Sequence, residues 1–274
     1  LSAGPRPGTI AATGEATLSV PALRQSLPSG AVAIVTGAGR GIGAGIAGAL
    51  SRRGMRVVVN YRSDDAAAKK TVEGLTAAGG QALAFKADLA SPDGPRALFE
   101  AAVRGFGRVD VVVNNAGPAV LRREILELTP AELRNSFEIY VSAAFELARL
   151  AAPGMRERGF GRVINILSSS VLGPSPAGWT AYVTAKHGLW GLTRCLALEL
   201  GPWGVTCNAV SPALVPPDQW SALSENQLRA MALRNPTRRL AAVRDVAETV
   251  AFLAGPEAQH INGANIPVTG GEAM

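Results

Sequence analysis

Short apolar runs recur along this chain at fairly even intervals, and their repetition restricts the possible folds more than any other feature. Each run holds about 4–6 apolar residues, many of them β-branched. The runs lack the alternation of polar and apolar residues that marks a strand with one solvent-exposed face. Such runs are typical of strands that are buried on both faces. The seven runs lie within residues 31–37, 55–63, 81–89, 108–117, 161–170, 204–213 and 264–271.

Helix-length segments separate these runs, at residues 41–54, 64–80, 92–107, 129–159 and 180–200. Alternation of strand and helix at this spacing predicts right-handed βαβ units and a parallel sheet. The sequence therefore predicts an α/β fold. It is a single doubly wound Rossmann domain, with a seven-stranded parallel sheet and helices on both faces.

Composition sets the domain organisation. The chain has 274 residues, 47% of them hydrophobic, which is enough for one well-buried domain. Residues 1–29 are rich in Gly, Pro, Ala, Thr and Ser and show no periodicity, which predicts an N-terminal arm ahead of a Rossmann-type domain at 30–274.

No signal peptide or membrane-spanning run is recognised, and cysteine occurs only at Cys195 and Cys207, so we expect a cytoplasmic protein. The two histidines form no cluster with metal-ligand spacing, so no metal site is expected.

The net charge of +6 raises the question of nucleic-acid binding. The arginines are scattered, however, and aromatic residues make up only 5% of the chain. This pattern does not favour a nucleic-acid surface. A few arginines near a phosphorylated cofactor are the simpler interpretation.

A glycine-rich segment, "TGAGRGIG" at 36–43, joins the first apolar run to the first helical segment. Glycines let the backbone turn sharply and approach a pyrophosphate, and the helix N-terminus that follows offers free N–H groups and a positive dipole end. In this context the segment predicts dinucleotide binding. The expected contacts are Gly37, Gly39, Arg40, Gly41, Ile42 and Gly43.

The end of the second apolar run indicates which nucleotide is bound. An acidic residue there would accept hydrogen bonds from the ribose 2′-OH of NAD. This chain instead has Asn60, Tyr61, Arg62 and Ser63. Arg62 can pair with a 2′-phosphate and Ser63 can donate to it, with Arg40 in reach of the same group. The sequence therefore predicts NADP(H) as cofactor.

A tyrosine and a lysine, Tyr182 and Lys186, lie four residues apart at the start of the segment 180–200. On a helix they share one face, one turn apart. Lysine is rare in this chain, with only Lys69, Lys70, Lys86 and Lys186. An ammonium near a phenol favours the phenolate, so we expect Lys186 to lower the pKa of Tyr182.

Together these segments resemble the short-chain dehydrogenase/reductase family, over about residues 30–274. The resemblance rests on "TGAGRGIG", "ADL" around Asp88, "NNAG" at 114–117, "YVTAK" at 182–186, "NPTRR" at 235–239 and "INGANIPVTGG" at 261–271. Bacterial 3-oxoacyl-carrier-protein reductases and secondary-metabolite ketoreductases look most similar.

The resemblance implies roles for particular residues. Tyr182 would be the general acid that protonates a carbonyl oxygen while NADPH delivers hydride, and Lys186 would also hold the nicotinamide ribose. Asp88, with Leu89 beside it, would contact the adenine. Further cofactor contacts would come from Asn115, Ala116, Gly117, Pro212 and Val215.

The serine that accompanies the tyrosine in this family is ambiguous here. The family spacing of 13 residues before the tyrosine selects Ser169. Strand register selects Ser168, with a one-residue insertion before Tyr182. We favour Ser168 and keep Ser169 as the alternative; either would hydrogen-bond the substrate carbonyl.

Two positions depart from the family pattern. Tyr140 stands where the family has an asparagine that organises a water relaying protons to the lysine. In "SPALVPP" at 211–217, Ala213 replaces a glycine, and Pro217 replaces a threonine and offers neither hydroxyl nor N–H. Both departures concern the nicotinamide end of the site.

The leading hypothesis is an NADPH-dependent carbonyl reductase acting on a small-molecule carbonyl substrate, either free or carrier-bound. The alternative is an NADP-binding relative with non-redox activity, such as a cyclase or dehydratase, or a binding subunit. We expect Trp179 and Trp220 to line an apolar substrate pocket. Segment 216–236 should form its lid. Resemblance also implies a homotetramer packed through residues 130–157 and 180–200.

Overall fold

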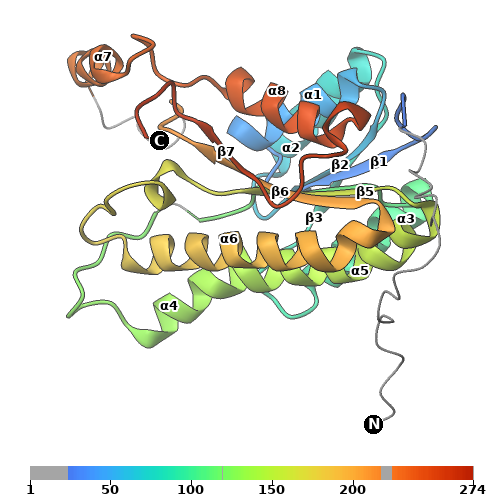
Figure 1. The fold of residues 1–274 in the computed structure, drawn as a ribbon, viewed down its shortest axis with the longest axis horizontal. Helices are drawn as coiled ribbons and strands as arrows, with labels where there is room; N and C mark the ends of the chain where they lie inside the picture. The colour runs from blue at the N-terminus through green and yellow to red at the C-terminus, as the bar shows by residue number, and fades with distance from the viewer. Residues whose placement is uncertain (1–23, 119, 217–223, 274) are drawn as a thin grey trace, which may run out of the picture.

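The computed structural model describes residues 24–118, 120–216 and 224–273 (Figure 1). Its centre is a seven-stranded sheet in the order β3-β2-β1-β4-β5-β6-β7, with all neighbouring strands parallel. Each strand falls within one of the predicted apolar runs, so the predicted α/β fold is confirmed. The strands are β1 (Val32–Val35), β2 (Arg56–Tyr61), β3 (Ala82–Lys86), β4 (Val111–Asn114), β5 (Gly161–Ile166), β6 (Val205–Pro212) and β7 (Asn265–Val268).

Helices cover both faces of this sheet (Figure 1). The first layer has α1 (Gly41–Arg52), α2 (Asp65–Ala77) and α8 (Val243–Ala254), and the second has α3 (Gly94–Phe106), α5 (Ala143–Arg158) and α6 (Thr180–Leu200). Alternate residues of β1 point into the two layers: Ala33 and Val35 into the first, Val32 and Ile34 into the second. The missing polar alternation in the sequence is thus a direct result of the double covering.

The helix expected at 129–159 has an internal irregularity. It begins as α4 (Pro130–Phe137), passes through one π-helical turn at Glu138–Ser142, and continues as α5. The Thr129 side chain and Glu132 form a capping box at its start. Tyr140 is the middle residue of the π-helical turn.

The structure also contains α7 (Glu225–Arg234), which lies within the expected lid segment, and α8, which was not predicted. Residues 243–254 have no Ser, Thr, Asn or Gly cap before them, and Ala242 occupies that position. The N–H of Ala242 is satisfied by the Asp245 carboxylate at 2.8 Å instead. No helix within the described ranges is long and apolar enough to cross a membrane.

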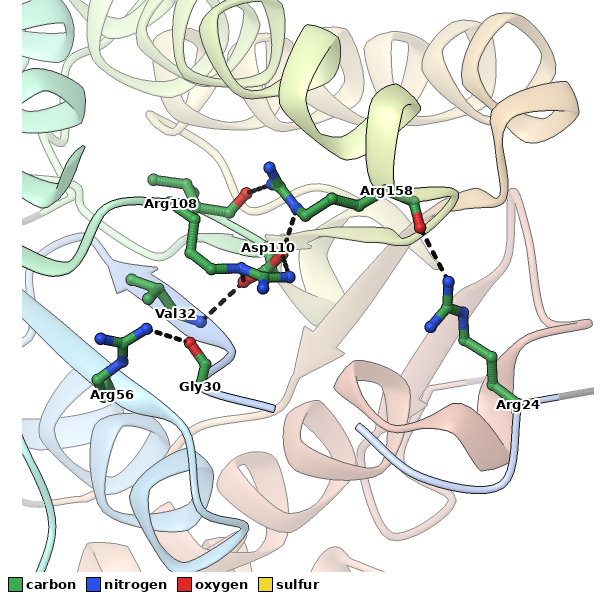
Figure 2. Close-up of polar contacts among 8 residues, drawn as sticks. Arg24, Gly30, Val32, Arg56, Arg108, Asp110 and Arg158 are labelled. Carbon is green, nitrogen blue, oxygen red and sulfur yellow. Dashed lines mark hydrogen bonds and ion pairs between the residues drawn. The ribbon is translucent and has the colours of Figure 1, made fainter. Parts of the chain in front are cut away.

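The end of the sheet opposite the glycine loop is held by one carboxylate, that of Asp110 (Figure 2). Asp110 is fully buried and accepts hydrogen bonds from the Val32 N–H at 2.9 Å, from Arg108 at 2.8 Å and from Arg158 at 2.9 Å. Arg24 Nη2 in turn donates to the Arg158 carbonyl at 2.8 Å. This arrangement joins β1, β4, the end of α5 and the chain just before β1.

Of the N-terminal arm expected at residues 1–29, only 24–29 fall inside the described ranges. Arg24 is tied to the domain a second time, because its N–H donates to Gln259 Oε1 at 3.2 Å. The boundary between arm and domain stays a prediction.

Candidate active site

The glycine loop between β1 and α1 depends on glycine at three positions. Gly37 has φ +61° and Gly41 has φ +56°, in the left-handed region that favours glycine. A Cβ on Gly43 would lie 2.3 Å from the Gly37 carbonyl oxygen and 2.7 Å from Asn115 Nδ2. The loop therefore folds tightly onto the end of β4, with Gly39, Arg40 and Ile42 at the start of α1. Its backbone could bind a pyrophosphate at the helix N-terminus.

Thr36, which the sequence analysis did not single out, fixes this loop to the end of β4. Its hydroxyl accepts from the N–H groups of Asn115 at 2.8 Å and Ala116 at 2.9 Å and donates to the Val113 carbonyl at 3.2 Å. Asn115 Nδ2 donates back to the Thr36 carbonyl at 2.9 Å. These residues are far apart in sequence and come together because β1 pairs with β4 in the sheet.

Residues at the end of β2 divide into two groups. Asn60 is buried and its Oδ1 accepts from the Gly37 N–H at 3.2 Å, so it supports the loop from below. The Tyr61 hydroxyl is bonded to Asp65 at 2.9 Å. Arg62, Ser63 and Arg40 are exposed. Within the described residues neither of these arginines takes part in a salt bridge, which leaves both available for an anion.

The predicted adenine contacts lie at the end of β3. Asp88 is exposed and its Oδ1 accepts from the Ala90 N–H at 3.0 Å, whereas Leu89 is buried in the core of the second helix layer. Asp88 is thus accessible to solvent, and the Leu89 side chain packs in the core.

Tyr182 and Lys186 lie one turn apart on α6, beside the carboxyl end of β5. Ser168, two residues after β5, is close enough to Tyr182 to lower the pKa of its phenol, and its Oγ accepts from the Ser170 N–H at 3.2 Å and from the Ser170 hydroxyl at 3.0 Å. Lys186 is 4% exposed, and its Nζ donates to the Ile166 carbonyl at 2.6 Å. Of the two candidate serines, Ser168 is the one that affects the pKa of the tyrosine, and Ser169 opens a short 3-10 turn.

Three aromatic rings line this part of the site. The ring of Tyr140 meets that of Tyr182 edge to face, with centroids 5.6 Å apart, and Trp179 does the same on the other side at 5.7 Å. Lys186 Nζ lies 4.1 Å from the centroid of the Tyr140 ring. The guanidinium of Arg122 covers Trp179 at 5.6 Å.

Burial controls the protonation of these groups. It lowers the pKa of Lys186 to about 7 and raises the pKa of Tyr140 well above its usual range. It also raises the pKa of Tyr182, a change that Ser168 partly offsets. The pKa of Tyr182 thus lies above its usual value on balance, and a lowering of that pKa by Lys186 stays a prediction. Lys186 Nζ donates to the Ile166 carbonyl, and the same Nζ lies 5.6 Å from the centroid of the Tyr182 ring.

A buried polar chain supports the site from below. Asn114 Nδ2 donates to Asn165 Oδ1 at 2.7 Å, and Asn165 Nδ2 donates to the Thr193 hydroxyl at 2.8 Å. Asn165 and Thr193 are completely buried. These hydrogen bonds connect β4, β5 and α6 beneath Tyr182 and Lys186. Only the first asparagine, as part of "NNAG", was recognisable in the sequence.

The remaining expected residues lie after β6. Pro212 ends this strand, and the Ala213 N–H donates to the Val268 carbonyl at 3.0 Å. Val215 packs against the core between the sheet and the first helix layer. Pro217 and Trp220 lie outside the described residues.

The sequence is similar to known reductases over almost the whole domain. The family described as enoyl-(acyl carrier protein) reductase matches residues 37–272. Hydroxynaphthalene reductase of Aspergillus fumigatus is 38% identical over 249 residues, covering 86% of this chain and 89% of that protein. The 3-oxoacyl-(acyl-carrier-protein) reductase of Staphylococcus aureus is 37% identical over 243 residues, covering 88% and 98%.

A solved structure agrees with these relatives. The blue fluorescent protein from a metagenomic library, in complex with NADPH, has a TM-score of 0.82 and 38% identity, and the match covers 89% of this chain and 98% of that one. The resemblance first identified from short motifs is confirmed, and the chain belongs to the short-chain dehydrogenase/reductase family and is a short-chain oxidoreductase.

Proposed function

We propose that this protein is an NADPH-dependent carbonyl reductase in which Tyr182 is the general acid. The observation that carries the proposal is the placement of Tyr182. It lies beside Ser168, which lowers the pKa of its phenol, and one turn from the buried Lys186, at the edge of the sheet where the glycine loop lies. In doubly wound folds ligands bind at this carboxyl edge.

The residues fit NADP(H). The tight loop at Gly37–Gly43 and the start of α1 would hold the pyrophosphate, and Asp88 would lie at the adenine. Exposed Arg62, Ser63 and Arg40 would receive the 2′-phosphate, where NAD-binding proteins place a carboxylate. When bound, the cofactor supplies hydride to the carbonyl carbon.

The protein's own residues would handle the proton. Ser168 would hold the carbonyl oxygen and Tyr182 would donate its phenolic proton to it. The raised pKa of Tyr182 keeps that proton in place at neutral pH until the oxygen becomes basic. Lys186 would stabilise the phenolate that remains.

The substrate would be an apolar, aromatic or polyketide-like ketone. Trp179 beside Tyr182 offers a flat apolar wall. Of the relatives, one is named for a hydroxynaphthalene and one for a carrier-bound 3-oxoacyl group, which makes a carrier-bound substrate the second choice. The non-redox alternative rests on the Tyr140 ring, which fills space beside Lys186.

NADPH consumption with a panel of aromatic and aliphatic ketones tests the function. We expect oxidation with at least one aromatic ketone, a loss of activity in Tyr182→Phe, and intact NADPH affinity in that variant. Ser168→Ala should reproduce the loss, and Ser169→Ala, its matched control, should keep most activity. Activity of Tyr182→Phe near the wild-type level would refute the assignment. Binding of NADPH without reduction of any ketone would favour the non-redox alternative.

We further propose that two copies pair through α5 and α6, as in the expected homotetramer. A groove of about 660 Å³ runs between these helices, lined by the apolar Phe145, Leu196 and Trp203. Arginines and glutamates both occur along it, at Arg149, Arg156, Glu157 and Glu199. A surface that holds both charges can complement itself across a twofold axis.

A further inference from the structure

Tyr140 occupies an unusual position in the backbone. It lies in the middle of the single π-helical turn between α4 and α5. Such turns insert one extra residue into a helix and are frequent at functional sites. Here the turn faces α6. The Tyr140 residue is only 4% exposed, and its ring lies against Lys186 of α6.

The Tyr140 ring makes contacts on two of its sides. Its face receives Lys186 Nζ at 4.1 Å from the centroid, within the range of a cation–π interaction. It meets Tyr182 edge to face at 5.6 Å. Its hydroxyl donates to the Pro118 carbonyl at 3.3 Å, which fixes the plane of the ring.

Space for this ring comes from Gly117. A Cβ at that position would lie 2.4 Å from Tyr140 Cε1 and 2.5 Å from its hydroxyl oxygen. Unlike Gly37, Gly117 has an ordinary negative φ, so contact with Tyr140, and not backbone strain, restricts this position.

We propose that Tyr140 is a positioning residue, whose ring holds the Lys186 ammonium against the Ile166 carbonyl and braces Tyr182. The catalytic part of this proposal rests on the proposed reductase function. The position of the ring against Lys186 and Tyr182 rests on the contacts alone. The groups that face Lys186 are Tyr182 from α6, Tyr140 from the π-helical turn and the Ile166 carbonyl from β5. Among the residues that the structure describes, Lys186 forms no ion pair with a carboxylate, so we infer that the ring and that carbonyl stabilise the ammonium.

Lysine NMR tests the geometry without any need for activity. The chain has only four lysines, so ¹³Cε labelling gives four resolvable signals. We expect one signal, assigned by loss in Lys186→Met, to be displaced by the ring current of Tyr140. Tyr140→Phe should keep that displacement, and Tyr140→Leu should abolish it and lower the pKa of Lys186 by about one pH unit. An unchanged signal and pKa in Tyr140→Leu would overturn the proposal.

Kinetics test the consequence for catalysis. Tyr140→Phe should stay within about threefold of wild-type kcat, because the ring remains, whereas Tyr140→Leu should lose about tenfold or more in kcat with little change in KM for NADPH. Phe137→Leu is the matched control, since Phe137 points from the same helix toward Gly188. Equal losses in Tyr140→Phe and Tyr140→Leu would refute a role for the ring. If the wild type reduces no ketone, the proposed function fails and the NMR result still decides the geometry.

A double-mutant cycle checks the pairing of Gly117 with Tyr140. Gly117→Ala should lower thermal stability in the wild-type background, and should cost much less when Tyr140 is changed to Asn. Additive effects would show that Gly117 does not make room for the ring.

Discussion

At the scale of single residues, Lys186 illustrates how burial decides the state of an ionisable group. Its pKa falls from the usual 10.5 to about 7 because the side chain is desolvated. In the unfolded chain the same lysine would keep its proton to about pH 10. Between these values the unfolded state binds more protons, so this group makes the folded state more stable as pH rises from 7 to 10.5.

Comparison with Lys186→Met isolates this effect. Relative to that variant, the wild type should gain roughly 2–3 kcal/mol of unfolding free energy between about pH 7 and pH 9.5. Denaturant titrations of both proteins at the two pH values, without nucleotide, measure it. A stability difference that is constant with pH would mean that Lys186 keeps an ordinary pKa.

Arg62 carries the choice of nucleotide in the proposed function. Arg62→Asp should weaken NADPH binding about 10- to 100-fold, because a charge-assisted contact is lost and a repulsion is gained, and should change NADH binding little. Fluorescence titration with both nucleotides gives the two Kd values. Arg104→Asp, at an exposed site on α3, controls for the change in net charge. An equal loss for both nucleotides would contradict the NADP assignment.

At the scale of elements, α1 and α8 pack so closely that one position admits only glycine. A Cβ on Gly45 would lie 2.2 Å from Val243 Cγ1. Gly48, one turn later on α1, faces a more open surface, and its Cβ would meet only the end of the Arg52 side chain, at 3.5 Å.

These two glycines give opposite expectations. Gly45→Ala should destabilise the protein by about 1–3 kcal/mol through overpacking, and Gly48→Ala should stabilise it by about 0.5–1 kcal/mol through helix propensity. Thermal or urea denaturation measures both. Val243→Ala in the Gly45→Ala background should recover part of the loss; no recovery would place the strain elsewhere.

The elements differ in how far the sequence could predict them. The five inner strands were recognisable because double burial leaves an unbroken apolar run, as at Val57–Val59 in β2, whereas the edge strands β3 and β7 are only partly buried. The α6 segment, with the spacing of Tyr182 and Lys186, was equally visible. Helix α8 was missed because its N-cap position holds Ala242 and its start depends on Asp245. The π-helical turn at Tyr140 was not predicted, and the contacts of Tyr140 with Lys186 and Gly117 join residues that are far apart in sequence. Thr36 gave no signal because its role exists only where β1 lies beside β4.

At the scale of the whole molecule, the α5–α6 groove offers a partly apolar surface for assembly. Phe145, which lines this groove together with Leu196 and Trp203, is 47% exposed. Apolar side chains gathered on one face are typical of contact surfaces.

Phe145→Arg should shift the protein toward a smaller species, because two copies of the arginine would face each other across the axis. Sedimentation of wild type and variant reports the mass directly. Leu233→Arg, on exposed α7, is the control with the same change in charge. A wild-type protein that sediments as a monomer would refute the proposed pairing.

The Asp110 cluster has a consequence for the order in which the chain can fold during synthesis (Figure 2). The ribosome delivers Val32 and Arg108 before or with this carboxylate, but Arg158 follows 48 residues later. Until then half of the charge compensation is missing, and a buried carboxylate that lacks a partner is costly. We therefore expect the nascent chain to keep the centre of its sheet open until α5 has emerged, so that the two halves of the domain close in a single late event.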